Sequence, residues 1–343
     1  MNLPKFIFGT SCLGNLYIET PKEVKRALIR EYLNVDKEQG ISFFDCAGKY
    51  GAGLALESLG ECLKELEVAP EDIIISNKLG WSRIPLSGSE PTFEPGVWKG
   101  LKYDAVQKIS YHGMLECYEQ GNQLLNGYPA NYVSVHDPDE YMALATDASD
   151  SEQRYGDILE AYRALRDLKR NGMAKAIGVG AKDWRIIQKI DADITLDWVM
   201  IANSMTVHDH PSELLDFMKK LERQGTVIIN SAVFNAGFLT GGQHYNYQFI
   251  DPRSERGKKL YNWREQFVAT CEEFNITPAA VCINFGISAP GVQSLALSTT
   301  NPNRIGFNAD LLNVEIPAFF WKRLFNQNLI SKDGLDMMLG NLV

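Results

Sequence analysis

Side chains of complementary chemistry lie near the ends of apolar, strand-like segments of this chain. Asp45 and Tyr50 stand in the run Phe43–Gly51, and Lys78 and His136 each come at the end of a later apolar segment. A tyrosine with an ordinary pKa of about 10 is a poor base at neutral pH, but a nearby lysine stabilises the phenolate and lowers that pKa. This combination suits proton transfer at an oxygen atom during carbonyl reduction or alcohol oxidation.

Each of these side chains has a role on that interpretation. Tyr50 is the general acid/base, and Lys78 tunes its pKa. Asp45 keeps Lys78 charged and in place, and His136 shapes the oxygen site by hydrogen bonding. Ordinary structural roles are the alternative, since Asp45 can cap a helix and Tyr50 can be a half-buried ring. Lys78 can likewise be a solvated loop charge and His136 a core imidazole, but the four matching residue types at successive strand ends favour the functional interpretation.

The elements that must position these residues alternate between short β-branched segments and segments of helical periodicity. Glu152–Arg170 and Ser212–Glu222 carry apolar residues at helical spacing. Alternation of strand and helix implies parallel strands joined by crossovers. Eight such strands without a polar linker predict an α/β fold, a single (β/α)8 TIM barrel domain over residues 1–343. The predicted strands are Phe6–Gly9, Ile41–Asp45, Ile73–Asn77, Tyr132–Val135, Ala176–Val179, Trp198–Ala202, Val227–Asn230 and Val292–Leu297.

The barrel is favoured over an open doubly wound sheet because no Gly-x-Gly-x-x-Gly motif follows the first strand. In such a barrel the active site lies at the C-terminal ends of the strands. Two connections, Leu79–Val106 and Thr240–Arg253, are longer than the usual βα loop of about 2–6 residues. We expect them to be long loops on the active-site face that act as lids.

Composition excludes several classes of function. The chain has 343 residues, a net charge of −9 and no basic run, which argues against a nucleic-acid partner. Its six dispersed cysteines form no Cys-x-x-Cys motif and fit a reducing cytoplasm better than a disulfide framework. Met1–Gly9 has no apolar stretch of signal-peptide length, and no segment approaches the roughly 18 apolar residues of a membrane span. We expect a cytoplasmic protein with a small-molecule substrate and no membrane partner.

The order and types of these residues make the chain resemble the aldo-keto reductases. The resemblance implies a (β/α)8 barrel that binds NAD(P) without a Rossmann domain. It also implies that Asp45, Tyr50, Lys78 and His136 occupy the family's four catalytic positions, with none substituted. The matching segments are Phe8–Thr10, Phe43–Gly51, Ser76–Gly80, Val135–Pro138, Asn171–Gly180, Gly237–Gly241 and Ser298–Asn308.

Within that family, three segments resemble the sugar dehydrogenase branch. They are the long Leu79–Val106 connection, His136–Asp139 and Gly178–Lys182. This branch includes L-fucose, D-threo-aldose and D-arabinose 1-dehydrogenases and also a pyridoxal dehydrogenase. The resemblance implies oxidation of the C1 hydroxyl of an aldose to a lactone. A reductase of small aldehydes or ketones, a pyridoxal dehydrogenase and a non-catalytic NAD(P)H-binding sensor remain as alternatives.

The resemblance also implies where the cofactor binds. Ser298 stands where the family often has a lysine that faces the 2′-phosphate of NADP, which favours NAD, although Arg304 can accept a phosphate or stack on adenine. Gly180–Ala181 replace a Ser-Asn pair that grips the carboxamide in the family. The predicted cofactor-binding residues are Gly9, Thr10, Asp45, Asn203, Ser231, Phe234, Gly237, Leu239, Ser298, Thr299, Arg304 and Asn308.

Aromatic residues in the long connections are candidates for the substrate site. Sugars bind to aromatic faces and a few directed polar groups, but packing is an equally good explanation for any one ring. The candidates are Tyr17, Trp81, Trp98 and Tyr245.

A metal-dependent hydrolase is the competing enzyme class. His208-Asp209-His210 has the composition of a metal-ligand triplet. Because Pro211 and a helical segment follow it directly, we interpret Asp209 or His210 as the N-cap of that helix. No metal site is therefore expected.

Overall fold

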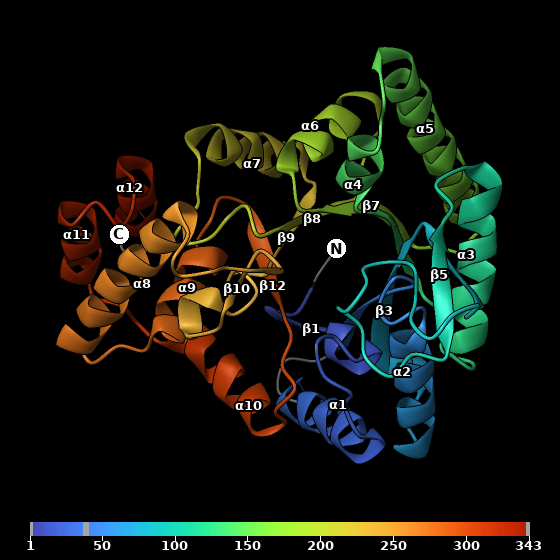
Figure 1. The fold of residues 1–343 in the computed structure, drawn as a ribbon, viewed down its shortest axis with the longest axis horizontal. Helices are drawn as coiled ribbons and strands as arrows, with labels where there is room; N and C mark the ends of the chain where they lie inside the picture. The colour runs from blue at the N-terminus through green and yellow to red at the C-terminus, as the bar shows by residue number, and fades with distance from the viewer. Residues whose placement is uncertain (1–2, 37–40, 341–343) are drawn as a thin grey trace. The chain divides into compact units, whose positions relative to one another are not determined.

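The computed structural model describes residues 3–36 and 41–340 (Figure 1). Met1 and Asn2, part of the N-terminal segment considered above, lie outside the described residues. The strands are β1 (Phe6–Gly9), β2 (Ser42–Ala47), β3 (Ile73–Leu79), β4 (Trp81–Pro85), β5 (Tyr103–Gln107), β6 (Tyr132–His136), β7 (Ala176–Ala181), β8 (Trp198–Ala202), β9 (Val227–Ser231), β10 (His244–Tyr245), β11 (Gln248–Phe249) and β12 (Val292–Leu297). The α-helices are α1 (Lys22–Asp36), α2 (Leu54–Glu65), α3 (Tyr111–Leu124), α4 (Pro138–Ala143), α5 (Ala148–Arg170), α6 (Trp184–Asp193), α7 (Ser212–Gln224), α8 (Glu255–Glu273), α9 (Pro278–Ile287), α10 (Asn303–Asp310), α11 (Ala318–Asn326) and α12 (Lys332–Gly340).

Eight of the strands form a closed barrel in the order β1-β12-β9-β8-β7-β6-β3-β2, which confirms the predicted fold class. The pairs β1–β2, β2–β3, β3–β6 and β6–β7 are parallel. The predicted bounds of β1, β8 and β12 are correct, whereas β2, β3, β6, β7 and β9 run one or two residues further at their C-terminal ends. The extension follows from the hydrogen-bond ladder, which continues past the apolar run to the pair Ala47↔Lys78.

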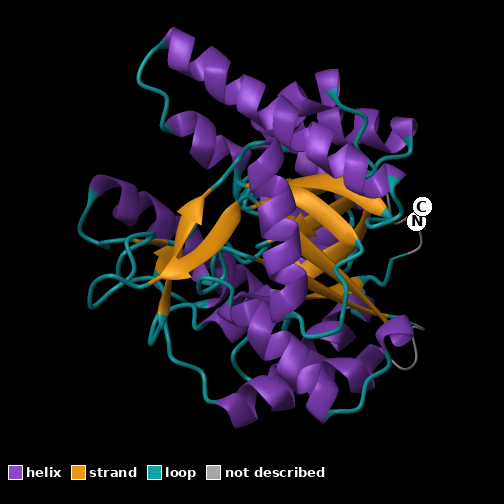
Figure 2. Cartoon of the chain, turned by 90° about the vertical axis from the view of Figure 1, so that its right-hand side faces the viewer, coloured by secondary structure: helices purple, strands orange, loops and turns teal. Residues whose placement is uncertain are grey.

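The chain forms two compact units, each described by itself. The first is Met1–Met200 with Ala296–Gly306, and the second is Ile201–Leu295 with Phe307–Val343. In the first unit, helices lie on the outer side of the strands, and Figure 2 views the chain from the side of α3 and α5, which pack against each other. The single domain over residues 1–343 stays a prediction.

Local sequence explains where the helices begin and end. The α7 helix buries the predicted apolar face, which includes Leu214, Phe217 and Met218, and it ends at Gly225 in the left-handed region, φ 79°. The α5 helix begins at an N-cap, Asp147, whose side chain accepts a hydrogen bond of 2.9 Å from the Asp150 backbone N–H. It therefore starts four residues before the predicted bound.

The two long connections each contain a pair of antiparallel strands, which the sequence analysis did not predict, and their role as lids stays a prediction. In the first, β4 and β5 pair from Trp81↔Gln107 to Pro85↔Tyr103. In the second, β10 pairs with β11. Backbone pairing satisfies the N–H and C=O groups of these long segments, which a packed irregular loop leaves to water or side chains. We call β4, β5 and the residues 86–102 that join them the β4–β5 hairpin.

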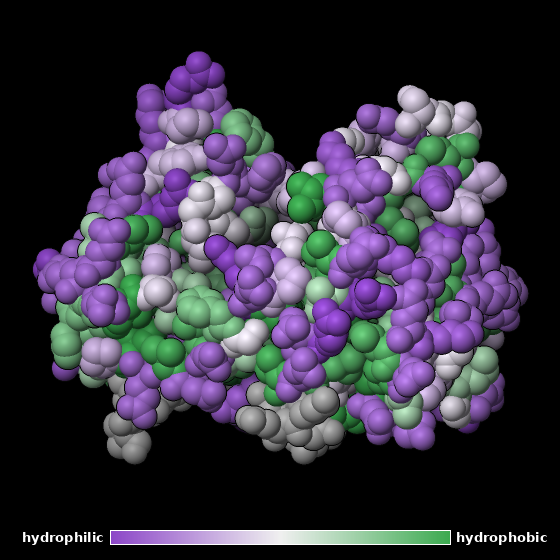
Figure 3. Space-filling model, turned by 90° about the horizontal axis from the view of Figure 1, so that it is seen from below, coloured by the Kyte–Doolittle hydropathy of each residue, from purple (hydrophilic) through white to green (hydrophobic). Residues whose placement is uncertain are grey.

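Among the residues that the structure describes, no helix combines the length and the apolar character that a bilayer crossing requires. On the face drawn in Figure 3, hydrophilic side chains are interspersed with smaller apolar areas. The six cysteines are free thiols and buried.

Candidate active site

A buried ion pair joins two neighbouring strands of the first unit. Asp45 lies in β2 and Lys78 in β3, and the Lys78 ammonium forms an ion pair with one carboxylate oxygen of Asp45. The other oxygen accepts a hydrogen bond of 2.8 Å from the Ser76 hydroxyl. Both charged residues are only 2% exposed, so water screens their attraction very little. The carboxylate therefore holds the lysine in one orientation.

The Tyr50 and His136 rings lie beside this pair. Tyr50 belongs to the turn between β2 and α2, and the Nζ atom of Lys78 is 4.8 Å from the centroid of its ring. His136, the last residue of β6, meets the Tyr50 ring edge to face, with centroids 5.6 Å apart. The turn requires Gly51, because its φ is 61° and a Cβ there would be 2.3 Å from the Gly14 carbonyl oxygen. The structure thus brings the four predicted side chains together.

Burial controls the protonation of His136. It holds the pKa of His136 well below the usual value, and the neighbouring Lys78 lowers it further although Asp137 opposes this effect. The imidazole is therefore neutral at pH 7 and carries one donor and one acceptor nitrogen. Within the described part of the chain, its Nδ1 atom is buried without a hydrogen-bond partner. A neutral imidazole with an unused nitrogen is suited to bind a substrate oxygen.

An aromatic cluster from the β4–β5 hairpin covers Tyr50. The Trp98 ring centroid lies 6.0 Å from that of Tyr50 and 6.4 Å from that of Phe93. Trp81 in turn contacts Phe93, with centroids 5.8 Å apart. Trp98 and Phe93 are each 6% exposed. The hairpin thus supplies an apolar wall beside the phenol, and two of the predicted substrate residues, Trp81 and Trp98, belong to it.

The other two predicted substrate residues lie in different surroundings. The backbone N–H of Tyr17 donates a 2.9 Å hydrogen bond to the Val97 carbonyl, next to Trp98. Tyr245 lies in β10 of the second unit, is 6% exposed and shares a 2.8 Å hydrogen bond with Nδ1 of His208. Packing accounts for the position of Tyr245, and its contact with a substrate stays a prediction.

The predicted cofactor residues of the first unit lie at strand ends and on α10. The Thr10 hydroxyl, directly after β1, donates a 3.0 Å hydrogen bond to the Asp45 carbonyl. The Ser298 hydroxyl, directly after β12, accepts a 3.3 Å hydrogen bond from Ser11. Arg304 is exposed on α10. These positions belong to the set Gly9, Thr10, Asp45, Ser298, Thr299 and Arg304.

In the second unit, Asn203 stands out among the predicted cofactor residues. It follows β8 with a left-handed φ of 62°, and it is 3% exposed. In the described residues neither its Nδ2 nor its Oδ1 atom has a hydrogen-bond partner. A buried amide without partners costs free energy, so the position fits a ligand that offers one donor and one acceptor. The carboxamide of a nicotinamide is such a group.

The remaining predicted cofactor residues of the second unit lie in β9, in the turn after it, and on α10. Ser231 ends β9, and its hydroxyl donates a 3.4 Å hydrogen bond to the Ile201 carbonyl. Gly237 has a φ of 88°, and no atom lies within 4 Å of where its Cβ would be. That open backbone suits the close approach of a phosphate. Phe234, Leu239 and Asn308 complete the set, the last two being buried.

The interpretation of the His208-Asp209-His210 triplet as a helix cap is wrong. The N-cap of α7 is Pro211, and no side chain caps the helix there. His210 instead links backbone segments of the second unit, because its Nδ1 lies 3.0 Å from the Thr206 carbonyl and its Nε2 accepts a 3.1 Å hydrogen bond from the Ser331 N–H. Pro211 has no side-chain acceptor, and the N–H groups of Leu214 and Leu215 donate instead to the Pro211 carbonyl, at 3.0 and 3.2 Å.

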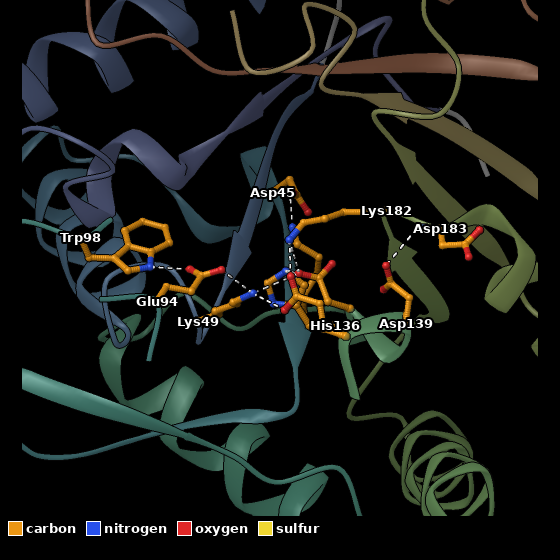
Figure 4. Close-up of polar contacts among 11 residues, drawn as sticks. Asp45, Lys49, Glu94, Trp98, His136, Asp139, Lys182 and Asp183 are labelled. Carbon is orange, nitrogen blue, oxygen red and sulfur yellow. Dashed lines mark hydrogen bonds and ion pairs between the residues drawn. The ribbon is translucent and has the colours of Figure 1, made fainter. Parts of the chain in front are cut away.

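Sequence reasoning missed a charged cluster beside His136. The Lys49 ammonium is 2% exposed and forms ion pairs with Glu94 at 2.9 Å, Asp137 at 3.3 Å and Glu140 at 2.6 Å. Lys182 also pairs with Asp137 and Glu140. We call these five residues the Lys49 cluster. Figure 4 labels Lys49, Glu94 and Lys182 of this cluster beside His136. The available signal was that lysines and carboxylates of opposite sign recur in the segments that follow β2, β6 and β7.

Comparison with known proteins finds a matching family and full-length relatives. Residues 5–326 match the profile of the Aldo/keto reductase family. A pyridoxal 4-dehydrogenase of Microbacterium luteolum is 27% identical over 338 residues, which cover 94% of this chain and 93% of that protein. A D-threo-aldose 1-dehydrogenase of a Pseudomonas species is 24% identical over 340 residues, which cover 96% and 95%.

Solved structures agree in fold. An aldo-keto reductase from Bacillus halodurans in its holo form superposes with a TM-score of 0.68 at 16% identity, over 95% of this chain and 92% of that one. The glycerol dehydrogenase from Gluconobacter oxydans gives a TM-score of 0.67 at 17% identity, over 94% and 91%. With the family profile matched over most of the sequence, the chain belongs to the aldo/keto reductase family and is an NAD(P)-dependent oxidoreductase.

Proposed function

We propose that the protein oxidises the C1 hydroxyl of a neutral aldose, such as L-fucose, to the lactone with NAD as the preferred cofactor. The observation that carries the chemistry is the meeting of the Tyr50 ring with the Lys78 ammonium at 4.8 Å and with the neutral His136 imidazole at 5.6 Å. The sugar is supported by the D-threo-aldose 1-dehydrogenase, to which the chain is 24% identical over nearly its full length.

In this mechanism the protein manages the proton. A bound nicotinamide supplies the hydride acceptor that such an oxidation needs. Tyr50 takes the proton of the C1 hydroxyl as a general base. The Lys78 ammonium, held by Asp45, favours the phenolate by its positive charge, and His136 orients the substrate oxygen by a hydrogen bond. The aromatic wall of Trp98 and Phe93 limits the access of water to the reacting oxygen.

Cofactor turnover gives the direct test. We expect absorbance of the reduced nicotinamide to grow with L-fucose, D-arabinose or another aldose of related stereochemistry, and to grow faster with NAD than with NADP because Ser298 provides no cation for a 2′-phosphate. The sugar assignment is contradicted if no sugar changes the absorbance while small aldehydes or ketones consume the reduced cofactor. Binding of NAD(P)H without turnover of any substrate identifies a sensor.

Pyridoxal is the second candidate substrate. The pyridoxal 4-dehydrogenase of Microbacterium luteolum is 27% identical to this chain, slightly above the aldose enzyme. Pyridoxal in its cyclic hemiacetal form presents the same group as an aldose, a hydroxyl on a carbon that also carries a ring oxygen. The same residues therefore serve both reactions, and pyridoxal belongs in the substrate panel.

We propose a cytoplasmic location and a single catalytic domain for either activity.

The predicted role of Asn203 is tested by cofactor affinity. We expect Asn203→Ala to raise the Kd for NADH roughly 10-fold, since it removes about two neutral hydrogen bonds to the carboxamide. Quenching of tryptophan fluorescence measures this without turnover. Asn122→Ala is the matched control, because the Asn122 side chain already accepts a 3.0 Å hydrogen bond from the Ala130 N–H. Equal NADH affinity in the two variants removes Asn203 from the cofactor site.

A further inference from the structure

The Lys49 cluster joins two parts of the first unit. The proposed oxidation needs these two parts at a fixed distance from each other. One part is the tip of the β4–β5 hairpin, which contributes Glu94. The other is the segment after His136, which contributes Asp137 and Glu140. Lys49 binds both, because its ammonium lies within 3.3 Å of a carboxylate oxygen from each of these residues. It also directly precedes Tyr50 in the chain.

The hairpin side of this connection leads to the wall of the site. Glu94 accepts a 2.7 Å hydrogen bond from the Trp98 indole N–H, and Figure 4 shows Glu94 between Lys49 and Trp98. Trp98 in turn lies 6.0 Å from Tyr50, centroid to centroid. Lys49 itself lies 5.3 Å from the centroid of the Trp81 ring. A chain of polar contacts therefore runs from Lys49 through Glu94 to the ring that faces the phenol.

The strand-end side leads to the imidazole. Asp137 Oδ2 lies 3.3 Å from Lys49 Nζ, 3.3 Å from Lys182 Nζ and 3.6 Å from His136 Nε2. The Asp137 backbone is left-handed, with φ 46°, and its N–H donates a 2.8 Å hydrogen bond to the Gly180 carbonyl. This conformation is uncommon outside glycine, asparagine and aspartate, and the ion pairs with the two ammonium groups hold the Asp137 carboxylate beside His136.

Charge and packing indicate that Lys49 does not serve as a binding group for an anionic substrate. Its ammonium already has three carboxylate partners and is 2% exposed. Three carboxylates and two ammonium groups leave the cluster with one net negative charge, so it carries no excess positive charge for an anionic ligand. The backbone of the β4–β5 hairpin also packs closely against the turn that carries Tyr50. A Cβ at Gly48 would be 2.4 Å from the Trp81 carbonyl oxygen, which leaves little room for the hairpin to move relative to that turn.

We propose that Lys49 is a positioning residue, which fastens the tip of the β4–β5 hairpin to the carboxylates beside His136 and so fixes Trp98 against Tyr50 as the wall of the substrate site. The inference rests on the proposed oxidation for its kinetic consequence. Its structural consequence, the anchoring of the hairpin tip, holds whatever the substrate is.

Hydrogen exchange tests the anchoring without any substrate. The N–H of Tyr17 bonds to the Val97 carbonyl, and the N–H of Lys99 bonds to the Asn15 carbonyl at 3.0 Å, so these amides report on the hairpin tip. We expect Lys49→Met and Glu94→Gln to increase their exchange roughly 10-fold, because each variant removes one partner of a directly coupled pair. In the double variant these amides should exchange at the same rate as in Lys49→Met, because both substitutions remove the same ion pair. Unchanged exchange in Glu94→Gln, which retains the shape of the side chain, overturns the proposal even if Lys49→Met fails to fold.

Matched controls separate this effect from loss of charge in general. Lys182→Met removes a lysine whose ion pairs are with Asp137 and Glu140 on the strand-end side, so we expect a smaller loss of protection at the hairpin tip than in Glu94→Gln. Glu57→Gln removes the ion pair with Arg83 at 2.9 Å, which holds the base of the same hairpin. The specific role of Lys49 is contradicted if Lys182→Met and Glu94→Gln lose equal protection at the amides of Tyr17 and Lys99.

Kinetics completes the test once a substrate is known. We expect Glu94→Gln to raise KM for the aldose roughly 10-fold with a smaller fall in kcat, because the wall and not the proton acceptor is displaced. The Kd for NADH should stay within about twofold, and Lys49→Arg should recover part of the lost kcat/KM that Lys49→Met does not. A rise in KM equally large in Glu57→Gln overturns the proposal. If no substrate is turned over, the proposed function fails, while the exchange measurement still decides the anchoring.

Discussion

Tyr50→Phe should lower kcat for alcohol oxidation by about 10²- to 10⁴-fold, the usual contribution of a general acid/base. The phenylalanine ring keeps the contacts with Trp98 and His136, which lie 6.0 and 5.6 Å away between ring centroids, so the fold and the wall of the site are retained. Only the phenolic oxygen, which accepts the substrate proton as the phenolate, is lost. Steady-state kinetics with the best aldose measures the effect, and NADH titration measures cofactor binding, which should change less than about twofold.

The comparison that isolates this role is Tyr118→Phe. The Tyr118 hydroxyl is buried like an active-site group but donates a 2.7 Å hydrogen bond to the Met173 carbonyl, away from the Asp45–Lys78 pair. That variant should retain kcat and lose only about 1 kcal/mol of stability. Wild-type turnover in Tyr50→Phe assigns the proton transfer to another group and removes the proposed mechanism.

Lys78→Met should have the largest effect on stability together with a loss of activity. It leaves the Asp45 carboxylate 2% exposed with only the 2.8 Å hydrogen bond from Ser76, and breaking a buried ion pair in this way costs about 3–5 kcal/mol. Urea unfolding should therefore give a lower free energy of unfolding. Turnover should fall about 10²-fold or more, because the charge that favours the Tyr50 phenolate is lost.

The double variant Lys78→Met with Asp45→Asn distinguishes the two effects. It removes both charges, so most of the lost stability should return while turnover stays low. Lys258→Met is the control for an exposed pair, since Lys258 and Glu255 are 62% and 84% exposed and the change should cost less than about 1 kcal/mol. Equal stability of Lys78→Met and wild type contradicts a buried, paired Asp45 in solution.

The barrel strands are visible in the sequence pattern. The alternation of β-branched runs with helical periodicity correctly predicted the eight barrel strands, because parallel strands buried on both faces are short apolar runs. It underestimated β2 and β3 at their C-terminal ends, because the predicted strands stop at the polar residues Asp45 and Asn77, whereas the structure continues them to Ala47 and Leu79. A hydrophobicity pattern treats a polar residue in a buried strand as the end of that strand.

The β4–β5 hairpin was missed for a related reason. Its strands Trp81–Pro85 and Tyr103–Gln107 are five residues each and include one proline and two charged residues, Arg83 and Asp104. Pairing between them is what satisfies their backbone groups, and residues 86–102 separate them, so no local signal indicates the partner. Tertiary contacts with the Tyr50 turn, including the close approach of Gly48 to Trp81, then hold the hairpin in place.

The sequence by itself determined the fold class, and it identified Asp45, Tyr50, Lys78 and His136 as side chains that meet at the strand ends. Both conclusions follow from the order of the strands and from residue type, which are read directly from the sequence. Only the tertiary structure decided that Lys49 binds Glu94, Asp137 and Glu140, and that Trp98 faces Tyr50. The physical reason is distance along the chain. Lys49 and Asp137 are separated by 88 positions, and which carboxylates reach a buried ammonium depends on how the strand ends and the hairpin converge in space.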